Sequence, residues 1–221
     1  MENWRVRAYI FQIAGAIIST ILIFIAMLFY AGGTPDNPNN QGYSFYNNTL
    51  SNLGMTVAYS GKSNTISMIL FSIALIVRSL SLIPFYLALR FFFNEISREK
   101  WFSSIGSIFG IIASLTTIGI VFTPVDILED PHMLFVYIGY TSTLIMGVCF
   151  SIAMYSNKDF PKHYTYLFII FTVVHFTISI MGLVGLASNR TLYVTAQKIG
   201  WIAGLICFVI VGYGCWNLEK S

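Results

Sequence analysis

The sequence predicts an all-α, polytopic integral membrane protein: a bundle of six transmembrane helices with the N-terminus and the C-terminus in the cytoplasm. Three observations predict this class. Apolar residues make up 56% of the 221 residues and charged residues only 10%, whereas a soluble domain carries about 25% charged residues. Six apolar segments are long enough to cross a bilayer. Lysine and arginine gather at one side of these segments.

The low charge excludes several classes of protein. An ordinary cytosolic enzyme, a disordered chain and a nucleic-acid-binding protein all need more charged residues than this chain offers. The net charge is only +3, and no basic run is present to follow a phosphate backbone. We therefore expect membrane lipids, and no nucleic acid, as partners.

The apolar segments form a single transmembrane domain that covers residues 1–221. A hydrocarbon core about 30 Å thick requires about 20 residues of helix. The first segment is too long for the core of a signal peptide, so we expect it to be retained. The expected helices cover residues 8–31, 66–92, 102–122, 132–155, 164–187 and 196–216, and a long outer loop covers residues 32–65.

The orientation follows from the basic residues that flank the segments. With the N-terminus inside, eight of them lie at cytoplasmic ends and three at outer ends, which is the bias of cytoplasmic loops. The third loop agrees, because it carries only acidic charges. Two glycosylation sequons, which begin at Asn47 and Asn189, also fall outside. The expected location is a cell membrane that the chain crosses several times.

The long outer loop combines two kinds of residue. Residues 34–40 are rich in Pro, Asn and Asp, which favour turns. Residues 43–46 are mostly aromatic. A loop this long in a compact bundle is usually functional or disordered, and the aromatic residues favour an ordered lid over the outer end.

Small residues at a spacing of four indicate close helix packing. They also offer faces for a homo-oligomer or for a partner in a membrane complex. The residues are Gly106 and Gly110 in the third helix, and Gly200 and Gly204 in the sixth.

Two charged or titratable residues lie in the middle of helices. Arg78 has no acidic residue in any span to pair with, and a central Arg costs about 2.5–3.5 kcal/mol on insertion scales. Either its side chain reaches the outer interface or Asp126, or it lines a cavity and holds a phosphate or carboxylate. His175 is expected to be neutral and hydrogen-bonded to a neighbouring helix. The expected ligand-binding residues are Arg78, His175, Asn52 and Gln197.

The outer face holds a candidate catalytic group. Asp130 is expected to cap the fourth helix, which places His132 in the first turn, where the helix dipole disfavours the charged imidazolium. A neutral His132 beside Asp126 resembles a general base. Ser51 lies on the same side, so an acyl-transfer role for Ser51, Asp126 and His132 is an alternative. No nucleophile-elbow glycine pattern surrounds Ser51.

Metals and other cofactors are not expected. The three histidines lie at the outer face, the inner interface and mid-span, so they cannot bind one ion together. The three cysteines, Cys149, Cys207 and Cys215, lie in apolar segments and are expected to be buried and unpaired.

These motifs resemble an uncharacterised six-helix membrane family, catalogued as domain of unknown function 998. Asn52 departs from the acidic residue that the family pattern leads us to expect. The family looks distantly similar to the FRAG/DRAM/SFK superfamily, whose members are linked to lipid and GPI-anchor handling. The resemblance therefore implies a lipid-related function. The matching positions are Ser51, Gly54, Pro124, Asp126 and His132.

Four functions are compatible with these features. The first is the binding of a lipid headgroup or another amphiphilic anion in an outward-facing cavity, with Arg78 as the anion clamp. The second is an outer-leaflet lipid-modifying enzyme that uses His132 and Asp126. The third is a small-solute transporter built around Arg78 and His175. The fourth is a structural subunit of a membrane complex.

Overall fold

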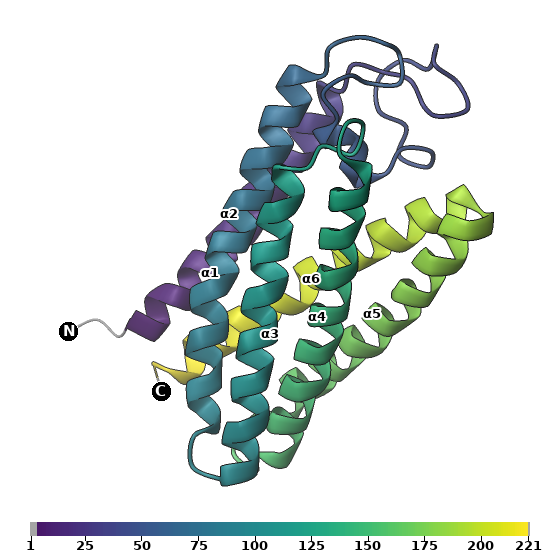
Figure 1. Cartoon of the computed structure of the whole chain (residues 1–221). Helices are drawn as coiled ribbons and strands as arrows, with labels where there is room; N and C mark the ends of the chain where they lie inside the picture. Colours follow the sequence, from purple (N-terminus) through teal and green to yellow (C-terminus); the bar gives the residue numbers. More distant parts are fainter. Residues whose placement is uncertain (1–3, 221) are drawn as a thin grey trace.

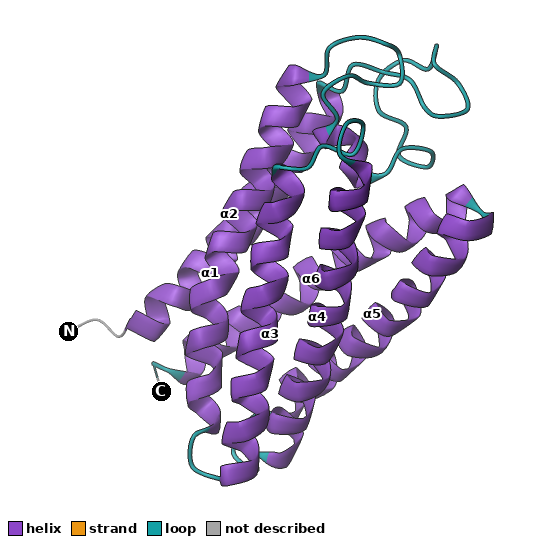
Figure 2. Ribbon diagram, in the orientation of Figure 1, coloured by secondary structure: helices purple, strands orange, loops and turns teal. Residues whose placement is uncertain are grey.

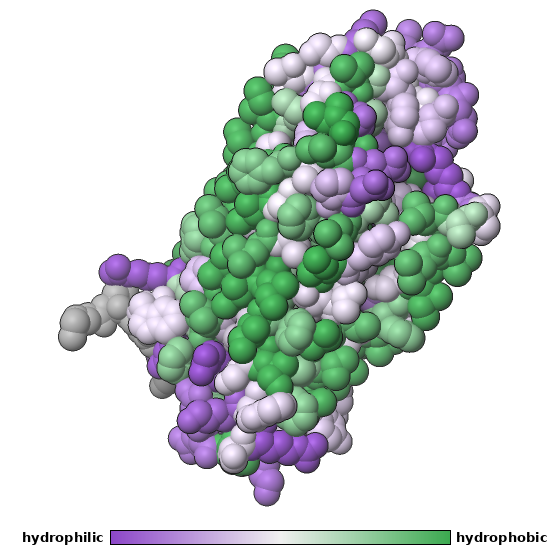
Figure 3. Space-filling model, in the orientation of Figure 1, coloured by the Kyte–Doolittle hydropathy of each residue, from purple (hydrophilic) through white to green (hydrophobic). Residues whose placement is uncertain are grey.

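The computed structural model describes residues 4–220, which fold into six long helices joined by loops (Figure 1). Each helix has 25–29 residues and is apolar enough to cross a membrane, so the expected all-helical class is confirmed. Hydrophobic side chains cover the middle of the molecule and hydrophilic ones gather at its two ends (Figure 3). The helices are α1 Trp4–Leu28, α2 Thr65–Leu89, α3 Ser97–Val121, α4 Glu129–Ser156, α5 Lys162–Ser188 and α6 Arg190–Leu218.

The helix boundaries differ from the expected ones by a few residues. α1 begins at Trp4 and α4 at Glu129, both earlier than the apolar pattern indicates. Asp130, the expected N-cap, lies with Pro131 inside the first turn of α4, and Leu128 occupies the cap position. A proline is tolerated there because the first N–H groups of a helix have no partner within the helix.

The helices run alternately up and down, so that both ends of the described chain lie away from the long first loop (Figure 1). An ion pair between Arg5 and Glu219, 3.0 Å long, joins the beginning of α1 to the residue after α6. We call the end of the bundle that carries residues 29–64 the loop end. The loops that gather there are drawn in teal in Figure 2.

α5 and α6 pack chiefly on each other and diverge from α4 towards the loop end (Figure 1). One residue, Asn189, separates them. Its side chain accepts a hydrogen bond from the backbone N–H of Leu192, 3.1 Å long. This caps α6, so the two helices form a tight pair whose tip stands apart from α4.

Aromatic side chains fill the half of the bundle that lies opposite the loop end. Phe85 of α2 and Phe208 of α6 meet edge to face, with ring centroids 5.8 Å apart, a geometry that aromatic pairs prefer. Six of the buried members of this cluster come from five helices: Tyr9, Phe85, Tyr86, Phe150, Phe168 and Phe208.

The first loop is ordered, as expected, and its middle forms a short 3₁₀ helix, η1 Leu50–Gly54. Leu53 is fully buried between α1 and α2. The buried amide of Asn64 donates to the carbonyls of Leu53 and Met55, at 3.1 and 3.0 Å, and accepts from the N–H of Ala31 at 3.1 Å. One side chain thus ties the beginning of the loop to η1 and to the start of α2.

A buried lysine of α6 holds the other face of the loop. The ammonium of Lys198 donates to the carbonyl of Asn48, 2.7 Å away, and to the carbonyl of Phe45. It also lies 5.4 Å from the ring centroid of Tyr43, a favourable cation–π distance. The loop is therefore fastened to α6 as well as to α1 and α2.

The four glycines singled out in the sequence, Gly106 and Gly110 in α3 and Gly200 and Gly204 in α6, face neighbouring helices of the same chain. A methyl group on Gly110 would lie 2.7 Å from the ring of Tyr86 in α2, and one on Gly106 would lie 2.9 Å from the ring of Phe150 in α4. Their use for association with another chain stays a prediction.

We expect Gly110→Ala to destabilise the bundle, because the added methyl group overlaps the buried ring of Tyr86. Overpacking of this kind costs about 1–3 kcal/mol. Thermal unfolding in a mild detergent should show a lower melting temperature for this variant. Gly182→Ala is the matched control, since a methyl group there meets nothing within 4 Å. Equal melting temperatures for Gly110→Ala and wild type would contradict the packing described here.

Candidate functional site

The candidate site lies at the loop end, where η1 meets the first turn of α4. The hydroxyl of Ser51 lies 3.1 Å from Nε2 of His132. Nδ1 of His132 lies 2.7 Å from the carbonyl oxygen of Thr123. A carbonyl oxygen can only accept, so in the neutral imidazole Nδ1 carries the proton and Nε2 accepts from the Ser51 hydroxyl. The structure thus brings together two of the three residues of the expected catalytic group.

Asp126 lies in the turn between α3 and α4 but does not orient His132. Its carboxylate accepts hydrogen bonds from the hydroxyl and the N–H of Thr56 and from the N–H of Val57, the last at 3.0 Å. The orienting acceptor for His132 is the Thr123 carbonyl instead. Asp126 therefore fastens the end of the first loop to the α3–α4 turn.

The surroundings of Asp126 favour its ionised form. Partial burial raises the pKa of this carboxyl, but the hydrogen bonds from Thr56 and Val57 outweigh burial and hold the pKa below its ordinary value of 3.8. Charge-assisted hydrogen bonds of this kind are stronger than neutral ones. The first loop is therefore attached to the α3–α4 turn by hydrogen bonds to an ionised carboxylate.

Ser51 and His132 line a polar cavity of about 310 Å³ between η1, α4 and the α5–α6 turn. The cavity carries charges of both signs, from Glu129 and Arg190, together with the side chains of Tyr59 and Tyr193. Its walls thus come from segments that are far apart in the sequence.

Arg190 is the most informative residue of the polar cavity. Its Nε donates to the carbonyl of Asn47 at 3.3 Å, and its Cζ lies 6.0 Å from the ring centroid of Tyr59. Its Nη2 is buried and has no hydrogen-bond partner among residues 4–220. A buried guanidinium N–H without an acceptor is costly, and a bound anion would supply the acceptor.

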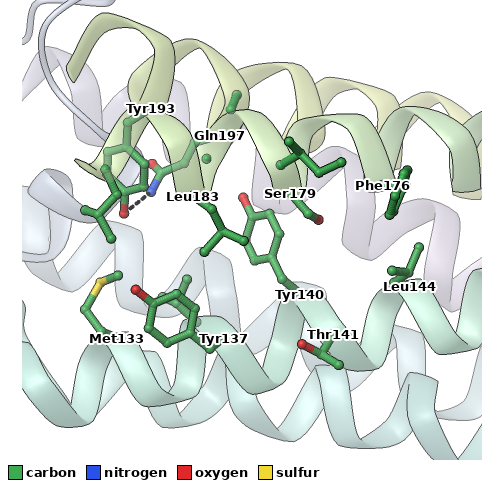
Figure 4. Close-up of a pocket in the computed structure, with 15 residues that line it drawn as sticks. Met133, Tyr137, Tyr140, Thr141, Leu144, Phe176, Ser179, Leu183, Tyr193 and Gln197 are labelled. Atoms are coloured by element: carbon green, nitrogen blue, oxygen red, sulfur yellow. Dashed lines mark hydrogen bonds between the residues drawn. The ribbon is translucent and has the colours of Figure 1, made fainter. Parts of the chain in front are cut away.

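An apolar groove of about 270 Å³ adjoins the polar cavity, between α4 on one side and α5 and α6 on the other (Figure 4). Three residues line both spaces: Met133, Leu186 and Tyr193. Leu183 and Phe176, which line the groove, are 57% and 52% exposed, so the groove opens sideways between the helices. The polar cavity and the groove together have the shape of a site for a molecule with a polar head and an apolar tail.

A few polar groups lie inside the groove. Tyr137 and Tyr140 of α4 point towards α5 and α6 (Figure 4). The amide of Gln197 donates to the hydroxyl of Tyr193 at 3.1 Å, and its carbonyl oxygen accepts from the N–H of Leu50 at 3.2 Å. Gln197, an expected ligand-binding residue, therefore connects the groove to η1.

Asn52, another expected ligand-binding residue, lines the polar cavity but is buried. Its side-chain oxygen accepts from the N–H of Thr49 at 2.9 Å. This bond stabilises the first turn of η1. The contacts of Asn52 thus hold Ser51, its neighbour in the chain, in place.

Neither Arg78 nor His175 lines the polar cavity or the groove. The guanidinium of Arg78 points into the bundle, 5.5 Å from the ring centroid of Phe208, and its Nη1 is buried without a partner in the described part of the chain. No ion pair with Asp126 forms among residues 4–220. Nε2 of His175 lies 3.0 Å from the carbonyl oxygen of Tyr140 on α4, which is the expected bond to a neighbouring helix.

The sequence reasoning missed Arg190 and the tyrosines of the groove. Arg190 entered it only as one of the outer basic residues. Two weak signals were present. Tyr137 and Tyr140 are three residues apart, and Tyr193 and Gln197 four apart, which places each pair on one face of a helix.

No protein-family model matches the chain, and neither a curated protein nor a solved structure matches it. The class of the protein therefore follows from the structure alone. It is a six-helix protein with helices apolar enough to cross a membrane and with a polar cavity and an apolar groove side by side at the loop end.

The attachment of the loop at Asp126 should depend on pH. Because the folded-state pKa lies below the ordinary value of 3.8, the stabilisation is complete above that value and is lost as the pH falls through the folded pKa. We expect a spin label on Lys62→Cys to become more mobile only in this acid range. Asp126→Asn should raise its mobility at neutral pH as well.

Labelling is selective because the three native cysteines are buried. Asp36→Asn is the matched control, since Asp36 is an exposed acid of the same loop. Unchanged mobility in Asp126→Asn at neutral pH would contradict the role given to this carboxylate.

Proposed function

We propose that the protein spans a cell membrane with both termini in the cytoplasm and binds an anionic amphiphile, such as a lipid, at its outer face. The polar cavity takes the headgroup and the groove takes part of the apolar chain. The observation that carries the proposal is that the two spaces adjoin, since Met133, Leu186 and Tyr193 line both of them.

The charge of the headgroup follows from Arg190. Arg190, whose buried Nη2 has no hydrogen-bond partner among residues 4–220, lies in the wall of the polar cavity. Phosphate and carboxylate are the groups that a guanidinium binds best. The carboxylate of Glu129 lies in the same wall and repels an anion. A headgroup that combines an anionic group with a hydroxyl or amine fits best, because the hydroxyl or amine can donate a hydrogen bond to Glu129.

The proposed orientation of the protein in the membrane agrees with the distribution of its basic residues. Six apolar helices fit a multi-pass membrane protein. The loop end carries fewer basic residues than the opposite end, as an outer face should. The groove then opens into the outer half of the bilayer, where the chains of outer-leaflet lipids lie.

This proposal keeps the lipid-headgroup function inferred from the sequence but moves the anion clamp from Arg78 to Arg190. The resemblance to the family catalogued as domain of unknown function 998 stays a prediction, and it agrees with a lipid ligand.

Native mass spectrometry in a mild detergent tests the headgroup site. We expect the wild type to retain an anionic amphiphile and Arg190→Gln to retain at least about tenfold less, because a lost charge-assisted hydrogen bond is worth about 1.5–3 kcal/mol. Lys62→Gln is the matched control, since Lys62 is an exposed basic residue of the same end. Loss of the amphiphile in Arg78→Gln, and not in Arg190→Gln, would place the site at the bundle centre and contradict the proposal.

Gly182 allows an independent test of the groove. It lines the groove, and a Cβ added there meets nothing within 4 Å. We expect Gly182→Leu to fold normally and to bind long-chain anionic amphiphiles at least about tenfold more weakly, because each methylene excluded from the groove forfeits up to about 0.8 kcal/mol. Short-chain analogues should be affected less. Equal losses for both chain lengths, or no loss, would show that the chain lies elsewhere.

A further inference from the structure

We propose that Ser51 and His132 are catalytic residues that cleave a carboxylic ester in the bound amphiphile by acyl transfer. The inference rests on the proposed function, because the cavity and the groove bring the ester to the pair. Binding alone would not require a serine hydroxyl and an imidazole nitrogen 3.1 Å apart in the wall of the cavity.

The position of the pair matches the position of an ester in an amphiphile. Esters of lipids lie between the polar head and the apolar chain. His132 lines the polar cavity, and Met133, the next residue, lines both the cavity and the groove. In a ligand with its head near Arg190 and its chain in the groove, we therefore expect the ester to lie near His132 and the Ser51 hydroxyl.

The protonation pattern is the one that a general base needs. Nδ1–H of His132 donates to the Thr123 carbonyl at 2.7 Å, which leaves the lone pair of Nε2 facing Ser51. The third member of this arrangement is a backbone carbonyl. It orients the imidazole as a carboxylate does in a catalytic triad, but it adds no full charge.

Ser51 is held on a rigid support. Its neighbours in η1 are fixed by Leu53, which is fully buried, and by the bond from Leu50 N–H to Gln197. The Asn52 side chain accepts from Thr49 on the other side of Ser51. A nucleophile fixed in this way meets its base without an entropic cost at each turnover.

The reaction proceeds in two balanced steps. Ser51 Oγ adds to the ester carbonyl carbon as its proton passes to Nε2 of His132. The ester C–O bond then breaks, and the proton passes to the departing alcohol, which leaves an acyl group on Ser51. Water, or the hydroxyl of a second lipid, attacks this acyl group and gives its proton to His132. The bond from the acyl carbon to Ser51 breaks, and Oγ recovers the proton.

The test is covalent labelling with a long-chain alkyl fluorophosphonate, which phosphonylates activated serines. Peptide mass spectrometry should locate the label on Ser51 in the wild type. Ser51→Ala should lose it, and His132→Gln should label at least about 100-fold more slowly, as expected when a general base is removed. Ser63→Ala is the matched control, since Ser63 is an exposed serine of the same loop, and it should label as the wild type does.

Turnover and thermal stability are measured on the same variants. We expect the wild type to release fatty acid from phosphatidylglycerol in detergent micelles, and Ser51→Ala to release none. A melting temperature of Ser51→Ala equal to that of the wild type in the same detergent shows that the variant folds.

Failure of this inference is distinguishable from failure of the proposed function. A wild type that retains the amphiphile but is not labelled at Ser51 overturns the catalytic proposal and leaves the binding proposal standing. A His132→Gln variant that labels as fast as the wild type also overturns it. A wild type that neither retains an amphiphile nor reacts with the probe overturns both.

Discussion

The side-chain amide of Asn64 is the contact on which the geometry of the site depends. It is buried just before α2 and holds the beginning of the first loop at Ala31 and the end of η1 at Leu53 and Met55. Hydrogen bonds shielded from water are stronger than exposed ones. Because η1 is fixed in this way, Ser51 faces α4, and a long loop becomes one wall of a cavity.

The divergence of α5 and α6 from α4 decides the shape of the other wall. In water, apolar residues such as Leu183 would favour closure of the groove, because burial of apolar surface is favourable. In hydrocarbon this force is absent, since lipid chains are as apolar as the side chains. In the proposed membrane setting, an open groove at the loop end is therefore compatible with a stable bundle.

The two arginines with a partnerless N–H differ in what surrounds them. Arg78 lies against the ring of Phe208 in the packed interior, where the aromatic face offsets part of the cost of its charge. Arg190 lies in the wall of a polar cavity that adjoins an apolar one. Only the second setting has a cavity for a headgroup, so the proposal assigns the binding of the anion to Arg190.

Hydropathy and length by themselves determined the six helices, because each apolar segment must be helical to satisfy its backbone in a membrane. Ser51 and His132 could also be singled out from the sequence, since their side chains carry recognisable chemistry. The first residue of α4 could not be predicted from the sequence, because Asp130 and Pro131 are as favourable inside the first turn as at the N-cap.

Only the tertiary structure decided which groups meet. The acceptor for His132 is the backbone carbonyl of Thr123, and a carbonyl has no signature in the sequence. Asp126 turned towards Thr56 and Val57 because the first loop folds back over the turn. Arg190 lies in the wall of the polar cavity because the α5–α6 pair diverges from α4. Hydropathy is a local property of a segment, whereas these contacts depend on how distant segments pack.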